Sequence, residues 1–230
     1  MTGIITALNE ELAPVLEKMT DTVCETVSGL TFTTGMLGSQ KVTAAVCGIG
    51  KVNAAICAQI MITRFGAEQV INTGIGGMLD PSLRQCDLVV GSGFVQHDFD
   101  IHDIDNVEPG YVPGPDCIII KPDEKLFDLI SGVCRELHPD RAHEGIIASG
   151  DQFIADRKIA DGIRERFGAD VCDMESSSMA HVCKLAGVPF AAVRCISDSA
   201  DDAEYNTYFE FRDAAARMSA ELICAAVERM

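Results

Sequence analysis

The sequence predicts an α/β fold, a single domain with a three-layer α/β/α arrangement around a mixed, mostly parallel central sheet. Short runs rich in Val and Ile alternate with longer stretches of helical period, which is typical of parallel strands covered by helices. The chain has 230 residues, 47% of them hydrophobic, which is enough for one sizeable core. No Ser/Gly-rich linker or repeat divides it, so we expect residues 1–230 to form one domain.

The expected strands are the short apolar runs, most of them followed by a glycine or an acidic residue. They are Gly3–Ala7, Leu30–Leu37, Val42–Cys47, Gln69–Thr73, Leu88–Phe94, Glu144–Ser149, Val171–Met174 and Phe190–Ile196. The second and third of these flank a turn at Leu37-Gly38-Ser39-Gln40, which favours a hairpin and therefore a mixed sheet.

The expected helices are the stretches in which apolar residues recur with helical period. They are Glu10–Met19, Val52–Phe65, Asp123–Leu137, Asp156–Phe167, Ser176–Ala186 and Phe209–Met230. One long irregular piece remains at Gln96–Pro122, which is Pro-rich and acidic. Long loops of this kind are often functional or lie at an interface.

The charge balance excludes some functions. There are 35 acidic against 18 basic residues, a formal charge of −17, whereas a protein that binds nucleic-acid backbones needs a basic surface. The mean hydropathy of +0.17 is too high for a disordered acidic chain. We expect a folded protein that binds neither nucleic acid nor membrane.

The ten cysteines and the first residues indicate a cytoplasmic protein. The cysteines are scattered singly, without a C-x-x-C pair, which favours reduced and mostly buried thiols. The start MTGIITALNEEL lacks a basic segment, and acidic residues interrupt its apolar run. No apolar stretch approaches the roughly 20 residues that span a bilayer.

Carboxylates follow several of the expected strands. In open α/β sheets ligands bind beyond the carboxyl ends of the strands, so Glu11, Asp151, Glu175 and Asp198 are expected to converge at one rim. Singly, each could be a helix cap or a first-turn acid. Together, like charges at one site need a proton, a cation or donor groups on a ligand.

A metal or a nucleotide cofactor is not expected at this rim. The acidic segment with His97, Asp98, Asp100, His102 and Asp103 has weak metal-ligand spacing and is interpreted as a solvated loop. The glycine turns at 48–50 and 74–77 fit neither G-x-G-x-x-G nor the P-loop pattern. An uncharged, hydroxyl-rich substrate remains the better partner for the carboxylates.

Six segments together resemble the 5′-methylthioadenosine/S-adenosylhomocysteine nucleosidases of the nucleoside phosphorylase family. They are GIITALNEEL at 3–12, GIGKVNAA at 48–55, INTGIGG at 71–77, SGDQFI at 149–154, DMESSSMAHVC at 173–183 and VRCISDSAD at 193–201. The resemblance implies the fold of that family and hydrolysis of an N-glycosidic bond with release of adenine. It also implies a homodimer, in which the loop around Tyr111-Val112-Pro113 lies near the partner's site.

The resemblance assigns roles to three carboxylates. Asp198 takes the place of the general acid that protonates N7 of the departing adenine, a role that suits a raised pKa. Glu175 takes the place of the glutamate that holds the ribose hydroxyls. Glu11 takes the place of the glutamate that positions and deprotonates the attacking water.

The resemblance also implies a set of substrate contacts. Phe153 is expected to stack on the adenine while the backbone of Ile154 reads its edge, and Met174 is expected to pack on the sugar. Arg194 stands where the family has an arginine near the water, and Ser197 stands beside Asp198. The apolar candidates for the alkylthio end are Leu8, Ile49 and Met174.

Three positions matter as departures or unexplained charges. Ile75 stands where the family usually has a serine, which removes a hydroxyl near the water and ribose, and Leu8 replaces the usual methionine. Asp173, just before Met174, adds a charge to which the sequence assigns no purpose.

The acceptor is expected to be water rather than phosphate. The chain has no arginine before Arg64, and Asn72 occupies the place of a phosphate-binding arginine in related phosphorylases. The alternatives are a futalosine or aminofutalosine hydrolase, a purine nucleoside phosphorylase, or a nucleoside-binding protein without catalytic activity.

Overall fold

A nine-stranded mixed sheet runs through the centre of the computed structural model, which describes residues 1–199 and 205–230 but not the side chains of 198, 199 and 205–210. Its strands are β1 (Thr2–Thr6), β2 (Thr20–Val27), β3 (Leu30–Leu37), β4 (Gln40–Val46), β5 (Gln69–Met78), β6 (Leu88–Gln96), β7 (Ala142–Ser149), β8 (Ala169–Asp173) and β9 (Phe190–Ser199). The order is β2-β3-β4-β1-β5-β8-β7-β6-β9, with a further pairing of β5 to β9. The expected hairpin joins β3 and β4, which are antiparallel.

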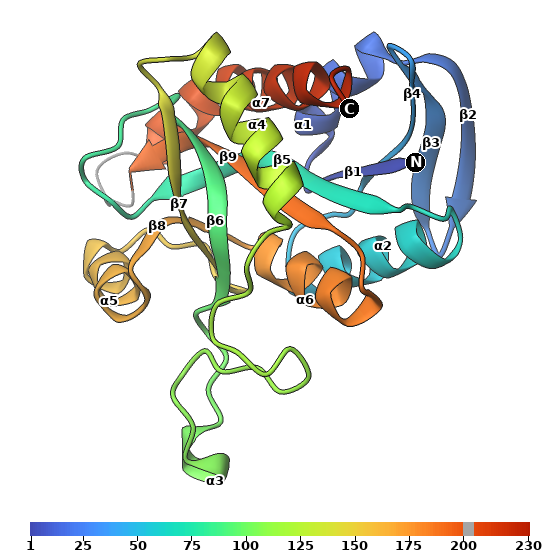
Figure 1. Ribbon diagram of the computed structural model, residues 1–230. Coiled ribbons are helices and arrows are strands. Elements are labelled where there is room, and N and C mark those ends of the chain that lie inside the picture. The colour runs from blue at the N-terminus through green and yellow to red at the C-terminus, as the bar shows by residue number, and fades with distance from the viewer. Residues whose placement is uncertain (200–204) are drawn as a thin grey trace.

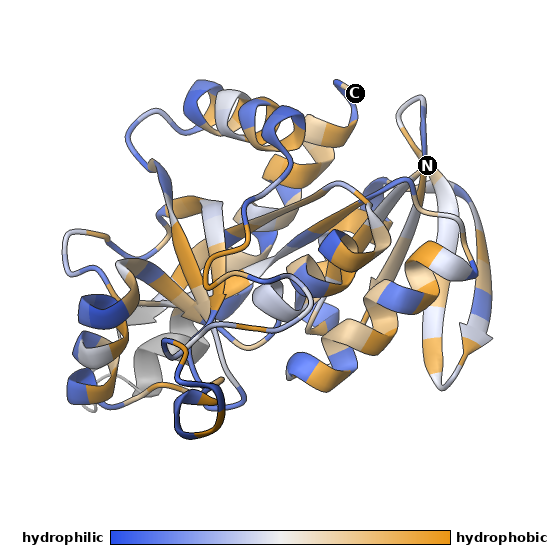
Figure 2. Cartoon of the chain, turned by 60° about the horizontal axis from the view of Figure 1, so that its bottom comes forward, coloured by the Kyte–Doolittle hydropathy of each residue, from blue (hydrophilic) through white to orange (hydrophobic). Residues whose placement is uncertain are grey.

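Helices cover both faces of the sheet, so the expected three-layer arrangement is confirmed (Figure 1). The helices are α1 (Asn9–Lys18), α2 (Lys51–Thr63), α3 (His102–Asp105), α4 (Glu124–Leu137), α5 (Arg157–Phe167), α6 (Ser176–Ala186) and α7 (Tyr205–Val227). Apolar residues of α1, α4 and α7 form one core with the sheet, and those of α2 and α6 form a second core on the opposite face. Figure 2 shows the hydrophobic strands inside, with hydrophilic residues mostly on the outer turns and helices.

One end of the sheet closes on itself. β5 pairs with β8 and β9, β9 pairs with β6, and β7 links β6 to β8. β5 and β9 have ten residues each and pair in parallel along their length. Their carboxyl ends therefore lie side by side in the closed part of the sheet. The closure brings the residues that follow β1, β7 and β8 to the same side of the molecule as the carboxyl-terminal parts of β5 and β9.

Three elements differ from the sequence prediction. The short helix α3 lies in the piece that was expected to be irregular. β2 was not expected, because all but its last residue are exposed and an edge strand without a buried face shows no alternating apolar pattern. β5 was expected to end at Thr73 in a glycine turn, but it continues through Gly74-Ile75-Gly76-Gly77 to Met78. These glycines serve close packing: a Cβ on Gly76 would lie 2.6 Å from Val171 Cγ1.

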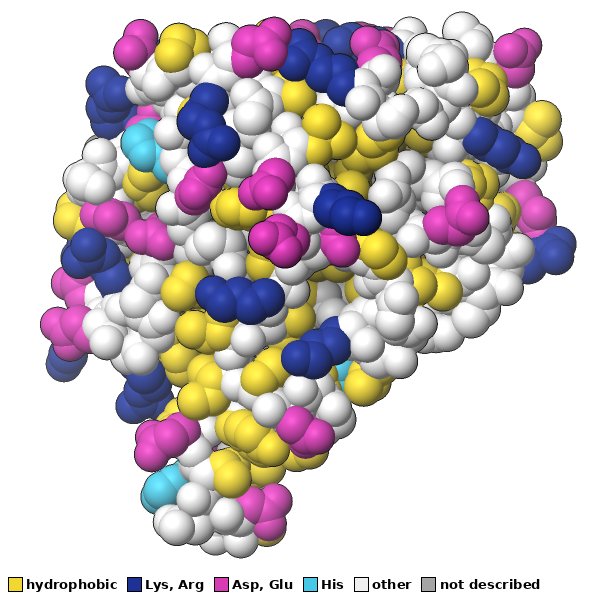
Figure 3. Space-filling view, in the orientation of Figure 1, with side chains coloured by type: hydrophobic (Ala, Val, Ile, Leu, Met, Phe, Trp, Pro, Cys, Tyr) yellow, Lys and Arg dark blue, Asp and Glu magenta, His cyan; other side chains and the backbone are white. Residues whose placement is uncertain are grey.

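The segment between β6 and α4 extends away from the body of the molecule and carries the short helix α3 (Figure 1). Figure 3 shows hydrophobic side chains among charged ones toward this segment. The ten cysteines are all free thiols, most of them buried. No helix among the described residues is both long and apolar enough to cross a membrane.

Candidate active site

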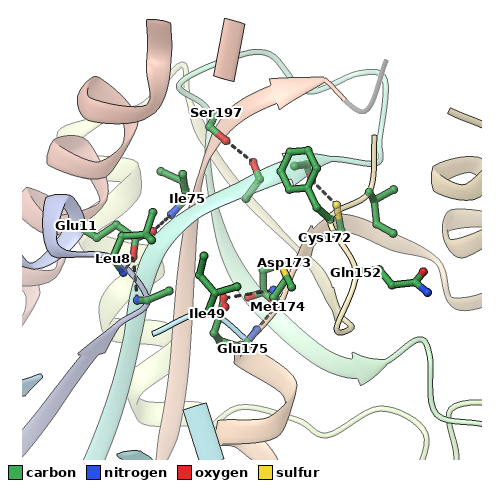
Figure 4. A pocket seen from close by; sticks show the side chains of 15 residues that line it. Leu8, Glu11, Ile49, Ile75, Gln152, Cys172, Asp173, Met174, Glu175 and Ser197 are labelled. Atoms are coloured by element: carbon green, nitrogen blue, oxygen red, sulfur yellow. Dashed lines mark hydrogen bonds between the residues drawn. The ribbon is translucent and has the colours of Figure 1, made fainter. Parts of the chain in front are cut away.

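A cleft of about 620 Å³, counting its open mouth, lies at the carboxyl ends of the closed part of the sheet (Figure 4). Nine of the predicted site residues line it: Leu8, Glu11, Ile49, Ile75, Phe153, Ile154, Met174, Glu175 and Ser197. The other lining residues are Ala7, Gly76, Gly77, Gln152, Cys172 and Asp173.

Glu11 is held at the bottom of the cleft by three backbone amides. Its Oε2 accepts hydrogen bonds from the N–H groups of Ala7 and Leu8, both at 2.9 Å, and its Oε1 accepts one from Ile75 at 2.9 Å. Burial raises the pKa of Glu11, while the charge of Arg194 and the amides partly oppose this. A carboxylate has about four acceptor positions, so one remains for a water in the cleft.

Gly74 is required for this arrangement. A Cβ at position 74 would lie 2.5 Å from Oε1 of Glu11, so the carboxylate would have to move away from the strand. The glycine in β5 therefore lets the carboxylate lie directly against the strand, where it receives the Ile75 amide.

Glu175 lies at the N-terminus of α6, across the cleft from Glu11 (Figure 4). Its Oε1 accepts a hydrogen bond from the Gly50 amide at 3.0 Å, and its Oε2 one from the Met174 amide at 3.3 Å. Burial and the nearby charge of Asp173 raise the pKa of Glu175 to about 7. The neutral form of Glu175 is therefore favoured more strongly than that of a free glutamate.

Arg194 lies beneath the cleft rather than among the residues that line it. Its Nη2 is 2.7 Å from Oδ2 of Asp173 and also donates to Oδ1 of Asn72, and its Nη1 donates to the Val193 carbonyl. Both Arg194 and Asp173 are buried. The charge of Asp173, unexplained by the sequence, thus neutralises a buried guanidinium, and the contact of Arg194 with an attacking water stays a prediction.

The mouth of the cleft is apolar. Ile49 and Phe153 are each 55% exposed at its rim, whereas Ile154 is buried. Ser197 is buried and its hydroxyl donates to the Gly76 carbonyl at 3.4 Å. The backbone of Asp198 pairs with Gly77 at the cleft edge, but its side chain lies outside the described part of the structure.

The expectation that Asp151 joins the carboxylates of the cleft is wrong. Its Oδ1 accepts a hydrogen bond from the Lys51 amide at 2.8 Å, at the first residue of α2. The Asp151 amide donates to Asp98 at 2.9 Å, and Asp98 forms a 2.5 Å ion pair with the Lys51 ammonium. Asp151 therefore caps a helix and fastens the loop after β7 to α2.

A comparison with protein families identifies the fold. The model of the phosphorylase superfamily matches residues 2–230. This chain belongs to the phosphorylase superfamily.

Individual relatives within the superfamily cover almost the whole chain. An aminodeoxyfutalosine nucleosidase of Campylobacter jejuni is 36% identical, over 99% of this chain and 98% of the relative. A 5′-methylthioadenosine/S-adenosylhomocysteine nucleosidase of Treponema pallidum is 37% identical, over 99% and 93%. The crystal structure of the corresponding Helicobacter pylori nucleosidase, in complex with a pyrrolopyrimidine-pyrrolidinol compound, is 33% identical with a TM-score of 0.94, and the match covers 100% of this chain and 98% of that one.

The cleft of this superfamily member contains one polar residue that the sequence pointed to without explaining. Asp173 adjoins the M-E pair, so its position indicated the site, but its partner Arg194 comes from a distant strand. Among the described residues that line the cleft there is no Arg, Lys or His, and the undescribed side chains at 198–210 include none by sequence. No group of three or more metal-ligating side chains is found within the described residues.

Proposed function

We propose that this chain hydrolyses the N-glycosidic bond of 5′-methylthioadenosine and S-adenosylhomocysteine and releases adenine. The observation that carries the proposal is the pair of buried carboxylates, Glu11 and Glu175, in a cleft with an apolar mouth and no cation among its described lining residues. Such a site suits a neutral nucleoside with an apolar 5′ substituent. Relatives named for this reaction match almost the whole chain.

The reaction needs a base, an acid and a group that supports the sugar. Glu11, whose pKa is raised by burial, accepts the proton of a water whose oxygen bonds to C1′. The C1′–N9 bond breaks, and Asp198 donates its proton to N7, so that adenine leaves as a neutral molecule. Glu175 accepts hydrogen bonds from the ribose hydroxyls and opposes the positive charge that develops on the sugar.

Water is the acceptor because the described residues that line the cleft include no Arg or Lys to hold a phosphate. A phosphate oxyanion needs Arg or Lys donors, and the buried Arg194 is already paired with Asp173. Glu11 would repel the phosphate at the position of attack.

The direct test is adenine release from 5′-methylthioadenosine in phosphate-free buffer. We expect turnover without phosphate and no increase when phosphate is added. A requirement for phosphate would overturn the assignment of water as the acceptor.

Asp198→Asn tests the acid. It should reduce turnover by about 10²-fold or more, because a positioned general acid supplies about that factor. Binding of the nucleoside, measured by calorimetry, should persist. Near-native turnover would remove Asp198 from the mechanism.

Aminodeoxyfutalosine is the second candidate substrate, because a relative named for it is as similar as one named for methylthioadenosine. Its adenine and ribose ends present the same groups to Glu11 and Glu175. Rates for the three nucleosides, measured side by side, decide between the candidates through their kcat/KM values.

The protein is also proposed to act as a homodimer. Ile49, just before α2, lines the cleft and is 55% exposed. Val52 and Ile56, which are 69% and 45% exposed, lie on one face of α2 and extend this apolar surface. A second copy that covers them, with the Tyr111–Pro113 loop beside it, would close the alkylthio end of the cleft. Light scattering should give the mass of a dimer for the wild type. Val52→Asp should yield a monomer with a higher KM. A monomer with wild-type activity would contradict the proposed role of the dimer.

The cytoplasm is the proposed location, because ten free thiols suit a reducing compartment. Fractionation of the native host tests it, and recovery of the protein outside the cytoplasm would contradict it.

A further inference from the structure

Asp173, the last residue of β8, is the most heavily bonded carboxylate of the site. Its Oδ1 accepts hydrogen bonds from the Ser149 hydroxyl and the Glu175 amide, and its Oδ2 from the Ser176 hydroxyl and amide. Arg194 of β9 forms the 2.7 Å ion pair. Asp173 therefore joins the end of β7, the start of α6 and β9 at one point.

These bonds replace the cap that Glu175 would otherwise provide. Glu175 occupies the N-cap position of α6, yet its side chain makes no capping hydrogen bond. Asp173 accepts from the first amides of the helix, and the Ser149 hydroxyl, itself bonded to Asp173, accepts from the Ser177 amide at 2.9 Å. The Glu175 carboxylate is thus left free to reach the Gly50 amide on the other side of the cleft.

The Asp173 carboxylate also affects the charge state of Glu175 and compensates the charge of Arg194. The groups that act on Glu175 are Asp173 from β8, Arg194 from β9 and Glu11 from α1, together with the Gly50 amide. Glu175 in turn acts on the thiol of Cys47, whose pKa burial raises well above its usual range. Asp173 and Glu11 favour the neutral form of Glu175, whereas Arg194 and the amide favour its charged form.

We propose that Asp173 is a positioning residue: it caps α6 in place of Glu175 and neutralises Arg194, so that the Glu175 carboxylate points into the cleft. The benefit to a ribose rests on the proposed function, but the positioning of Glu175 does not. Asp173 itself acts through Glu175 and Arg194 rather than on the substrate.

The test follows Glu175 directly by ¹³C NMR of its carboxyl group, assigned by comparison with Glu175→Gln. In Asp173→Asn the negative charge is lost while Arg194 remains, so the pKa of Glu175 should fall by about one unit or more. The Gly50 amide proton should shift, because its hydrogen bond to Glu175 is disturbed. An unchanged titration of Glu175 together with an unchanged Gly50 amide would overturn the proposal.

Asp87→Asn is the matched control. Asp87 is also fully buried, and it accepts from the Arg84 amide and lies near the Arg141 guanidinium, but it does not line the cleft. This variant should lose stability without moving the titration of Glu175. A comparable shift in Asp87→Asn would show that the effect is a general consequence of losing a buried charge.

Asp173→Glu separates geometry from charge and serves if Asp173→Asn does not fold. The charge is kept but the longer side chain disturbs the cap, so the Gly50 amide should shift while the pKa of Glu175 changes little. Unchanged Gly50 in this variant would overturn the capping role. In both variants the KM for 5′-methylthioadenosine should rise by a larger factor than kcat falls. If the wild-type protein did not hydrolyse this nucleoside, the proposed function would be refuted. The NMR result would still decide the role of Asp173.

Discussion

Two kinds of carboxylate follow strands of the same sheet and behave oppositely. Glu11 and Glu175 are buried, are held by backbone amides, and have raised pKa values. Asp98 is more exposed; burial would raise its pKa, but Lys51 and the Asp151 amide together lower it. A carboxylate that has its own cation serves the structure, whereas one held only by neutral donors keeps its basicity for a substrate.

The sharpest test of this difference is the isosteric pair Glu11→Gln and Asp98→Asn. Loss of the base should lower the turnover of 5′-methylthioadenosine by about 10² to 10⁴-fold. Loss of the Asp98–Lys51 pair, whose side chains are 23% and 15% exposed, should lower it by less than about fivefold, because neither residue lines the cleft. Steady-state assays in one buffer give both numbers, and equal losses would abolish the distinction between the two groups.

The pH dependence of the free energy of unfolding is a second test of the buried carboxylates, here of Glu175. Glu175 has a pKa near 7 when folded, raised by burial, against 4.5 as a free group. Its neutral form therefore stabilises the fold fully below pH 4.5, and this contribution is lost as the pH rises through 7. The loss amounts to about 3 kcal/mol in the free energy of unfolding by pH 8.

Urea unfolding at pH 5 and pH 8 measures this loss, with Glu175→Gln as the comparison. The variant has no titrating group at position 175, so its stability should fall less between the two pH values than that of the wild type. Identical pH dependence in the two proteins would show that Glu175 is not perturbed by burial.

Asp151→Ala should have a smaller and purely structural effect. The variant loses the cap on the Lys51 amide, which corresponds to about 1 kcal/mol of stability. It also frees the loop that carries Phe153, so KM should rise. Asp156→Ala is the matched control, because Asp156 caps α5 through the amides of Lys158 and Ile159 and does not fasten the loop to α2.

Thermal melts and KM values separate the two variants. Both should melt earlier by a few degrees, and only Asp151→Ala should change KM. A changed KM in Asp156→Ala, or none in Asp151→Ala, would contradict the role assigned to the loop.

Local patterns predicted the fold well wherever a strand is buried on both faces. Val, Ile and Ala fill β4 and β9, and these runs are visible in the sequence. The exposed β2 shows no such pattern, and the glycines of β5 have the composition of a turn although packing against Glu11 and Val171 keeps them in the strand. Tertiary contacts, not local preference, decide these segments.

The sequence predicted a site residue correctly only where its place after a strand is enough to bring it to the cleft. Glu11 and Glu175 follow strands that end at the cleft, so the prediction from strand ends located them. Asp151 also follows a strand, but its carboxylate accepts a hydrogen bond from the amide of Lys51, 100 residues away in sequence, and so caps α2. The partnership of Asp173 with Arg194 likewise depends on the closure of the sheet, which no single segment encodes.

Ile75 offers the finest test, because its backbone and side chain do different things. Its amide holds Glu11 at 2.9 Å whatever the side chain, while the side chain lines the cleft and packs against the apolar core beside it. Ile75→Ser adds a hydroxyl near Glu11 and the sugar, and Ile75→Ala removes similar volume without one. Both should lose similar stability, so a difference between them isolates the hydroxyl. We expect the ratio of kcat/KM for methylthioadenosine to that for aminodeoxyfutalosine to change by less than about tenfold in Ile75→Ser, and to change less in Ile75→Ala. Identical ratios in the two variants would mean that the inner wall of the cleft selects its substrate by volume alone.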